Sequence, residues 1–326
     1  MTGRREFVLA LLGGASGLRL TTSSFAQAPI SPVAAPSAPI TVTKLTESVA
    51  VCAGDGGNVG LLLGVDGLVL VDGGLATRAA ELARAVGDID GRAVQVLINS
   101  HYHFDHVGSN ELLGRQAAPG RLRIVAHQNV AARLSQRFAN EAFGRTFEPL
   151  APEGLPTDTF TRSGRLAVGN ETIEYVHVPL AHTDGDSYVF LPGSNILQTG
   201  DLLWIGRYPV VDYSAGGTLA GMISAVDRLM NVGDAGTRVI PGHGPVVGKA
   251  EMRATRDIWA TINERVDRMM RAGRMLEEVL AAAPTREFDA QLGTATRDSF
   301  IRQTYGGLAT RITPAAPVPL PTPPPR

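Results

Sequence analysis

The run AVQVLINS has the length and composition of a buried strand, and it leads directly into HYHFDH, residues 101–106. Three histidines and an aspartate within six positions constrain the fold, because imidazoles contribute little to a core and need a scaffold to bring them together. In an extended segment, residues two apart point the same way, so His101 and His103 can share one metal ion. The chain must then turn, so that Asp105 and His106 face a neighbouring position. The hexapeptide therefore predicts partial ligand sets for two metal ions.

Three further residues with metal-binding side chains follow strand-like runs: His182 in AHTDGD, Asp201 in QTGD and His243 in PGHG. Loops held by a rigid scaffold are where binding groups tend to lie. His182 can complete the first ligand set and His243 the second, with Asp201 shared through its two carboxylate oxygens. Nitrogen and oxygen ligands without cysteine suit Zn²⁺, and Fe or Mn also remains open.

Short apolar runs separated by Gly, Asp and Asn turns come before and between segments of helical periodicity. Strands are predicted in ITVTKLT, SVAVCAG, NVGLLLG, LVLVD, AVQVLINS, RLRIVAH, RLAVGNETIEYVHVP (a hairpin turning at Gly169-Asn170), DSYVFLP, NILQTGD and TRVIPGHGP. Helices are predicted over residues 75–86, 108–115, 128–138, 218–232, 249–273, 275–283 and 297–305. A Gly/Pro-rich loop is predicted between the third helix and Pro156. The order of strands, helices, strands and helices, without a repeat, predicts two αβ halves stacked sheet to sheet.

Asp72 ends the strand-like run LVLVDGG. Together with HYHFDH, His182, Asp201 and His243, it gives five motifs in the order typical of the metallo-β-lactamase fold superfamily. The sequence closely resembles that family from about residue 42 to 247. The C-terminal helices lie outside the resemblance. It implies an α+β fold, a four-layer αβ/βα sandwich in which two stacked mixed β-sheets are flanked by helices. It also implies that the first metal takes His101, His103 and His182, that the second takes Asp105, His106 and His243, that Asp201 is shared, and that Asp72 orients the ligands.

The reaction implied is hydrolysis by a hydroxide held on two Zn²⁺ ions, with Asp105 orienting it. The bond cleaved is an ester, thioester, lactone, amide or phosphoester, and a β-lactam is among the candidates. Many β-lactamases of the superfamily carry cysteine or serine where Asp201 stands, whereas a bridging aspartate is typical of thioesterase-, lactonase- and phosphodiesterase-like members. The alternative is a mononuclear-iron oxidoreductase of the same fold, similar to persulfide dioxygenases. A non-catalytic binding module would be expected to have lost ligands, and all seven are present.

Side chains that could contact a small-molecule substrate follow Asp201 in the stretch LLWIGRYPVVDYSAGG. Trp204, Arg207 and Tyr208 are the candidates. The alternative is that Trp204 and Tyr208 pack in the core and that Arg207 pairs with a carboxylate. Phe104, after the second histidine of HYHFDH, stands where the family often has a small residue, which predicts a narrower or drier pocket.

The first 28 residues have the features of an export signal: Arg4-Arg5, an uncharged apolar run and the small-x-small sequence Ala26-Gln27-Ala28. The twin arginine resembles a bacterial Tat signal, and an ordinary Sec signal is the alternative. The run from Phe7 to Leu18 is shorter than the roughly 20 apolar residues that a membrane span needs. We therefore expect a periplasmic mature protein without stable membrane association.

The predicted organisation is a signal over 1–28, a Pro/Ala-rich linker over 29–40, the folded domain over 41–311 and a Pro-rich tail over 312–326. The net charge of -1 gives no indication of nucleic-acid binding. The single cysteine, Cys52, is predicted to be buried in a strand. Oligomeric state is not predicted.

Overall fold

A computed structural model describes residues 39–310 of the chain. The predicted export signal, the linker up to residue 38 and the tail from residue 312 lie outside the described residues. Within them, no helix is both long enough and apolar enough to span a bilayer.

Two mixed sheets form the centre of the domain. The first has the strand order β1-β2-β3-β4-β5-β6-β9, antiparallel through β4 and parallel from β4 onward. The second has the order β10-β11-β12-β13-β14, with only β13 and β14 parallel. The strands are β1 (Thr41–Lys44), β2 (Val49–Ala53), β3 (Val59–Leu63), β4 (Leu68–Val71), β5 (Val94–Asn99), β6 (Arg123–His127), β9 (Asp158–Phe160), β10 (Ser163–Val168), β11 (Glu171–His177), β12 (Ser187–Leu191), β13 (Ile196–Gln198) and β14 (Arg238–Ile240), and a separate hairpin is made by β7 (Phe138–Asn140) and β8 (Arg145–Phe147).

The alternation of side chains along the strands explains how both faces of the first sheet are buried. In β2, Val49 and Val51 face the second sheet, where they pack in one cluster with Ile173 and Val189. Ala50 and Cys52 point the other way and pack in the cluster that contains helix residues. Because a strand has a period of two, continuous apolar runs such as VAVC are the pattern expected when both faces are covered.

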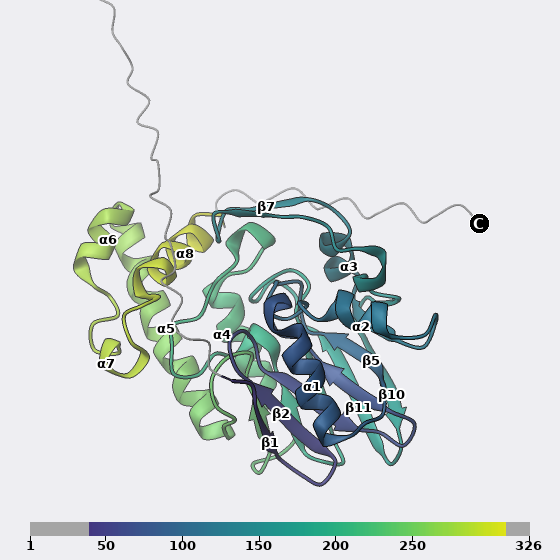
Figure 1. Cartoon of the computed structure of the whole chain (residues 1–326). Helices are drawn as coiled ribbons and strands as arrows, with labels where there is room; N and C mark the ends of the chain where they lie inside the picture. The colour runs from purple at the N-terminus through teal and green to yellow at the C-terminus, as the bar shows by residue number, and fades with distance from the viewer. Residues whose placement is uncertain (1–38, 311–326) are drawn as a thin grey trace, which may run out of the picture. The chain divides into compact units, whose positions relative to one another are not determined.

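Helices cover the outer faces of the two sheets. Leu82 and Val86 of α1 lie one turn apart and pack on the first sheet. On the second sheet, Met222 of α4 and Trp259 of α5 are fully buried in a cluster that includes strand residues such as Leu197 and Val239. Figure 1 shows α1 and α2 together and α5, α6, α7 and α8 grouped apart from them. The helices are α1 (Ala79–Ile89), α2 (Asn110–Gln116), α3 (Gln128–Leu134), α4 (Leu219–Leu229), α5 (Lys249–Arg271), α6 (Leu276–Ala282), α7 (Asp289–Leu292) and α8 (Arg297–Thr310), with short 3₁₀ turns η1 (Ala76–Arg78), η2 (Pro152–Gly154), η3 (Gly200–Leu202) and η4 (Tyr213–Ala215). The predicted αβ/βα sandwich is confirmed.

One predicted segment is wrong. The helix expected over 128–138 ends at Leu134, and the region expected to be a loop contains the β7–β8 hairpin. The hairpin strands have three residues each, too few for a period of two to be recognised in the sequence. The four-residue α7 was also not predicted.

Candidate metal centre

The seven predicted ligands and Asp72 all come from segments that follow strands. Asp72 directly follows β4, HYHFDH follows β5, His182 lies in the loop after β11, Asp201 follows β13, and His243 follows β14. The carboxyl ends of β4 and β5 lie side by side in one sheet, and those of β13 and β14 lie side by side in the other. A backbone hydrogen bond from Ser187 to the Ser100 carbonyl, 2.8 Å, joins the two sheets at this point. The two sets of loops therefore meet at one end of the sandwich.

The first cluster joins three imidazoles and a carboxylate, all buried: His101, His103, His182 and Asp201. His103 Nδ1 lies 3.1 Å from His101 Nε2 and 2.8 Å from His182 Nε2. Asp201 Oδ2 lies 3.6 Å from His101 Nε2 and 3.3 Å from His182 Nε2. Ligands about 2.0–2.1 Å from a tetrahedral zinc ion lie about 3.3 Å from one another, which is close to these spacings.

The second cluster joins Asp105, His106 and His243. His243 Nε2 lies 3.3 Å from Asp105 Oδ2 and 3.5 Å from His106 Nε2. Asp201 Oδ1 lies 3.1 Å from His106 Nε2 and 3.4 Å from His243 Nε2. One oxygen of Asp201 therefore faces each cluster. The structure brings all seven predicted residues together, in the two groups that the sequence predicts.

Asp72 orients two of the imidazoles. It accepts a hydrogen bond from the Ser100 hydroxyl at 2.8 Å and contacts His106 Nδ1 at 2.9 Å. Because the Ser100 hydroxyl has given its hydrogen to Asp72, it must accept from His101 Nδ1, 3.0 Å away. Asp72 adopts a left-handed backbone conformation with φ 68°, which is uncommon for a residue other than glycine and is found where the surroundings require it. Asp72 therefore contacts His106 directly and His101 through Ser100, and its role in orienting metal ligands stays a prediction.

The imidazoles of His103 and His182 are held by oxygen atoms that can only accept a hydrogen bond. His182 Nδ1 lies 3.0 Å from the Val210 carbonyl oxygen, and His103 Nε2 lies 2.9 Å from Asp212 Oδ2. Each outer nitrogen must therefore carry the hydrogen. The ring nitrogens that face one another, His101 Nε2, His103 Nδ1 and His182 Nε2, then each present a lone pair to the same small space. A shared cation stabilises this arrangement. These residues fit a metal ion.

The charges of the centre lead to the same conclusion. Burial lowers the pKa of His101 well below its usual value and that of His182 to about 4, so both imidazoles are neutral at pH 7. Burial opposes ionisation of Asp201, yet His106 and His243 hold its pKa well below its usual value. Among the described residues, the ion-pair partners of Asp105 and Asp201 are all histidines. Buried charges are either paired or coordinate a metal ion, and two carboxylates that share one cluster of imidazoles fit the second case.

Asp212 was not among the predicted residues. It is fully buried, and its Oδ2 accepts from the Tyr102 hydroxyl at 2.5 Å and from Asn140 Nδ2 at 2.7 Å, in addition to His103. Its Oδ1 accepts from Ser214 Oγ at 2.7 Å. Burial opposes ionisation, but the bond from His103 holds the Asp212 pKa below its usual value. No motif signals it, since 109 positions separate it from His103.

The predicted substrate contacts divide into three cases. Trp204 is buried, and its ring lies 3.9 Å from the His243 ring, so it supports a ligand. Arg207 is exposed and has no ion-pair partner in the described part of the chain, so it remains a candidate. Tyr208 is fully buried: its ring stacks on Phe300 at 5.1 Å, and its hydroxyl donates to Asp289 Oδ1 at 2.7 Å. The substrate-contact expectation for Tyr208 is therefore wrong, because the C-terminal helices cover it.

The β7–β8 hairpin covers the approach to His103. Phe143 at its tip packs its ring 4.8 Å from the His103 ring and 6.1 Å from that of Phe104. The hairpin is held on one side by Asn140, which binds Asp212, and on the other by Gln303 Nε2 of α8, which donates to the Ala142 carbonyl at 3.0 Å. Figure 1 shows it bridging the region between α3 and α8. An aromatic cover of this kind excludes water from one side of the centre.

The remaining two histidines lie outside both clusters. His127 and His177 stack with ring centroids 3.7 Å apart, and His127 Nε2 donates to the Thr161 carbonyl oxygen at 3.1 Å. His127 Nδ1 accepts from the Asn129 backbone at 3.3 Å and so caps the start of α3. Both imidazoles have structural roles.

Two stacked mixed sheets with outer helices, carrying a His/Asp cluster able to hold metal ions at one end, define a metallohydrolase-type scaffold. A model of the metallo-beta-lactamase superfamily matches residues 53–255. The chain belongs to this superfamily, as the five motifs indicate, and it is an enzyme of that superfamily. A search of curated protein sequences finds no match.

Solved structures with the same fold include a metallo-beta-lactamase from Pontibacter korlensis, with 21% identity, a TM-score of 0.55 and coverage of 68% of this chain and 99% of that one. The DIM-1 metallo-beta-lactamase has 17% identity and a TM-score of 0.55, over 69% of this chain and 99% of that one. A double mutant of the sec-alkyl sulfatase PisA1 has 17% identity and a TM-score of 0.57, over 84% of this chain and 50% of the sulfatase. At these identities the likeness shows the fold alone.

Proposed function

We propose that this protein is a dinuclear-zinc hydrolase that cleaves an ester, thioester, lactone or amide bond, a β-lactam included, in a small molecule. The observation that carries the proposal is the position of Asp201, whose two oxygens face two separate clusters. His101, His103 and His182 would hold one ion, and Asp105, His106 and His243 the other. Bound divalent ions supply a Lewis acid and lower the pKa of a bound water toward about 7. The second cluster favours two ions over the single iron of the alternative oxidoreductase.

Asp105 is the ligand placed to act on the reacting groups. Its side chain is 15% exposed, more than that of any other residue in the two clusters. Burial opposes its ionisation, but His106 and His243 hold its pKa below the usual value, so it is a carboxylate at pH 7. A carboxylate at the open side of the centre can orient a water molecule by accepting its hydrogen bond.

The test combines metal analysis with a substrate panel. Mature protein, residues 29–326, is assayed by proton release with a β-lactam, a lactone, a thioester and an aryl ester, with and without chelator. His101→Gln removes a ligand, and His177→Gln is the matched control outside the clusters. Two zinc ions per chain, with chelator-sensitive hydrolysis lost only in His101→Gln, is the expected result. One iron per chain, with oxygen consumption on a persulfide, would overturn the proposal in favour of the oxidoreductase.

We also propose that residues 1–28 direct export to the periplasm by the Tat route, on the strength of Arg4-Arg5 and the apolar run that follows. Replacing both arginines by lysine should leave the precursor in the cytoplasm. Unchanged export of the double variant would indicate the Sec route instead.

A further inference from the structure

A cavity of about 350 Å³ lies beside HYHFDH, between the start of α1, the helix α2 and the β7–β8 hairpin. Its wall is largely apolar and includes Phe104, Val107, Leu112, Phe147 and Leu150. Exposed residues at its edge, such as Ala80 of α1, show that it reaches the surface. Apolar clefts of roughly 300–1,000 Å³ are where small ligands commonly bind.

Two walls of the cavity are side chains of the hexapeptide itself. Tyr102 and Phe104 alternate with the ligands His101 and His103. The Phe104 ring stacks on Phe147 at 6.0 Å and, through Phe143, connects to the His103 ring. The Phe104 ring therefore lies at the boundary between the cavity and the candidate metal centre, and because Phe104 and Asp105 are both partly exposed, a substrate can reach from one to the other over Phe104. Phe104 is followed directly by Asp105, the most exposed ligand.

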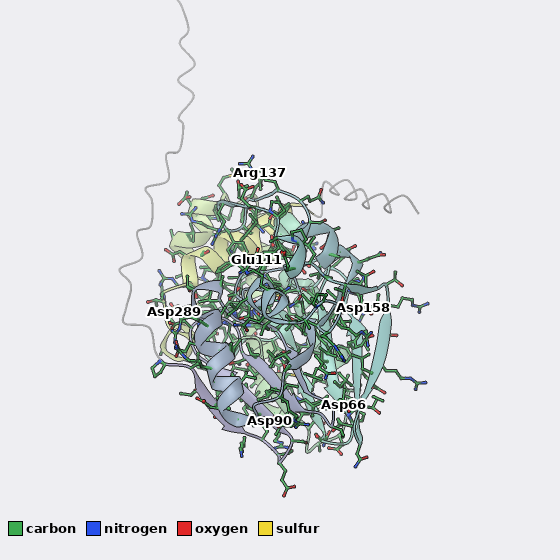
Figure 2. The ribbon with its side chains drawn as sticks, turned by 45° about the vertical axis from the view of Figure 1, so that its right-hand side comes forward. Asp66, Asp90, Glu111, Arg137, Asp158 and Asp289 are labelled. Atoms are coloured by element: carbon green, nitrogen blue, oxygen red, sulfur yellow. The ribbon has the colours of Figure 1, made fainter. Side chains whose placement is uncertain are left out.

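The charged side chains that line the cavity are each paired with an opposite charge, and Arg145, outside the lining, lies 4.7 Å from the centroids of the Phe104 and Phe147 rings. At its edge, Glu111 pairs with Arg115 at 3.0 Å, and Glu148 pairs with Arg137 at 3.0 Å. Glu111 and Arg137 are labelled in Figure 2. The buried Arg133 in the wall pairs with Asp184 at 2.7 Å. No net charge faces the cavity from these pairs, so an uncharged apolar group is the occupant that costs least to desolvate.

We propose that this cavity binds the apolar acyl or aryl portion of the substrate while the scissile bond lies at the metal centre. The proposal rests on the proposed hydrolase function and adds its substrate class: a neutral hydrophobic ester, thioester, lactone or amide. An engineered cavity of about 150 Å³ binds benzene, so the present one suits a group about twice that size, such as an octyl chain or two fused rings.

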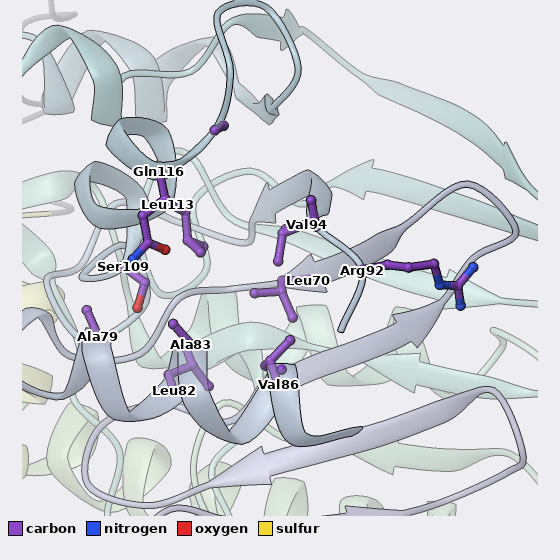
Figure 3. A pocket seen from close by; sticks show the side chains of 13 residues that line it. Leu70, Ala79, Leu82, Ala83, Val86, Arg92, Val94, Ser109, Leu113 and Gln116 are labelled. Atoms are coloured by element: carbon purple, nitrogen blue, oxygen red, sulfur yellow. The ribbon is translucent and has the colours of Figure 1, made fainter. Parts of the chain in front are cut away.

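A second cavity supplies a matched control. It has a volume of about 170 Å³ and lies on the other side of α1, where Leu82, Ala83 and Val86 line it together with Leu113 (Figure 3). Ala80→Phe places a ring in the first cavity and Ala83→Phe places one in the second. Both changes are on the same helix, three residues apart, so they impose similar demands on folding.

The experiment has two arms, on protein as isolated. The first measures binding of 1-octanol and 1-butanol by calorimetry. The second measures kcat/KM for p-nitrophenyl esters with acyl chains of two to ten carbons. We expect octanol to bind more tightly than butanol and kcat/KM to rise about fourfold per methylene until the cavity is full. Ala80→Phe should weaken octanol binding at least tenfold and flatten the chain-length series, whereas Ala83→Phe should change neither.

The two arms separate this inference from the proposed function. Octanol binding that Ala80→Phe abolishes, with no ester hydrolysis, would support the cavity and count against the hydrolase proposal. Hydrolysis without chain-length dependence, together with octanol binding that is absent or equal in both variants, would overturn the cavity alone. Leu112→Ala gives a further check that enlarges the cavity and does not fill it. This variant should shift the acyl-chain length with the highest kcat/KM to longer chains.

Discussion

Replacing Asp212 by asparagine tests whether this buried carboxylate positions a metal ligand. Asp212 Oδ2 accepts from His103, Tyr102 and Asn140, and Oδ1 accepts from Ser214 and the backbone of Ala215. An amide of the same shape has only one acceptor oxygen, so its NH₂ group must face donors on one side. If the NH₂ group faces His103, the imidazole loses the acceptor that keeps its hydrogen on the outer nitrogen.

The expected loss is 10–100-fold in metal affinity, the usual cost of removing the partner of a ligating histidine, which corresponds to about 1.4–2.8 kcal/mol. The unpaired donors should also lower the stability of the chelated protein by about 1–3 kcal/mol. Competition with a chromophoric chelator gives the affinity, and thermal unfolding after chelation gives the stability of the protein alone.

Ser214→Ala is the control, because it removes a donor from Oδ1 and leaves His103 bound to Oδ2. It should lower stability slightly and leave metal affinity within about twofold of the unchanged protein. A purely structural Asp212 would show the reverse of our expectation: both variants would lose stability and neither would lose affinity. That result would refute the positioning role.

Three more predictions rest on other parts of the structure. Chelation should lower the free energy of unfolding, by about 2.7 kcal/mol relative to protein with free zinc at 100 times its Kd; equal melting curves with and without chelator would contradict a bound ion. A Cβ at residue 242 would lie 1.9 Å from Asp201 Oδ1, so Gly242→Ala should displace the carboxylate and reduce zinc below two per chain, whereas Gly236→Ala, with its nearest neighbour at 3.4 Å, should retain both ions. Burial, with the stacked His177, lowers the pKa of His127 to about 4. On acidification the unfolded chain therefore becomes protonated at this residue before the folded chain does, and the free energy of unfolding should fall as the pH drops from about 6.5 to 4. His127→Asn keeps a capping acceptor and should remove about 1–2 kcal/mol of that loss in urea unfolding; an identical pH profile would contradict it.

The sequence predicts the grouping of most of the ligands because they directly follow buried strands, whereas His182 lies in the loop after the partly buried β11. Apolar runs such as LVLV and VQVLIN are unambiguous strands, and a ligand placed just beyond a strand end has little freedom of position. Parallel neighbours bring their carboxyl ends to one edge, so Asp72 and His101 must be close once β4 and β5 pair. This part of the centre follows from local patterns and sheet topology.

Features that depend on packing between distant segments could not be predicted from the sequence. Asp212 lies in an irregular stretch, and only the folded chain shows that it meets His103 and the hairpin residue Asn140. Tyr208 resembles a substrate contact because it follows Asp201 closely, but helices near the C-terminus, outside the resemblance, bury it against Phe300. A polar or aromatic residue in a loop can be assigned to a site or to a core only when what covers it is known.

The ligands of the centre come from both sheets, and this has an energetic consequence. His101 and His103 follow a strand of the first sheet, whereas Asp201 and His243 follow strands of the second. An ion bound by both sets therefore adds its binding free energy to the packing of the two halves. Apart from Tyr102 and Phe104 of the hexapeptide and Val107 and Gly108 directly after it, the walls of the neighbouring cavity come from α1, α2, α3 and the β7–β8 hairpin, which contribute no ligand. Changes in these elements can alter which substrate fits without disturbing the residues that hold the metal, so specificity and metal binding should be separable by mutation.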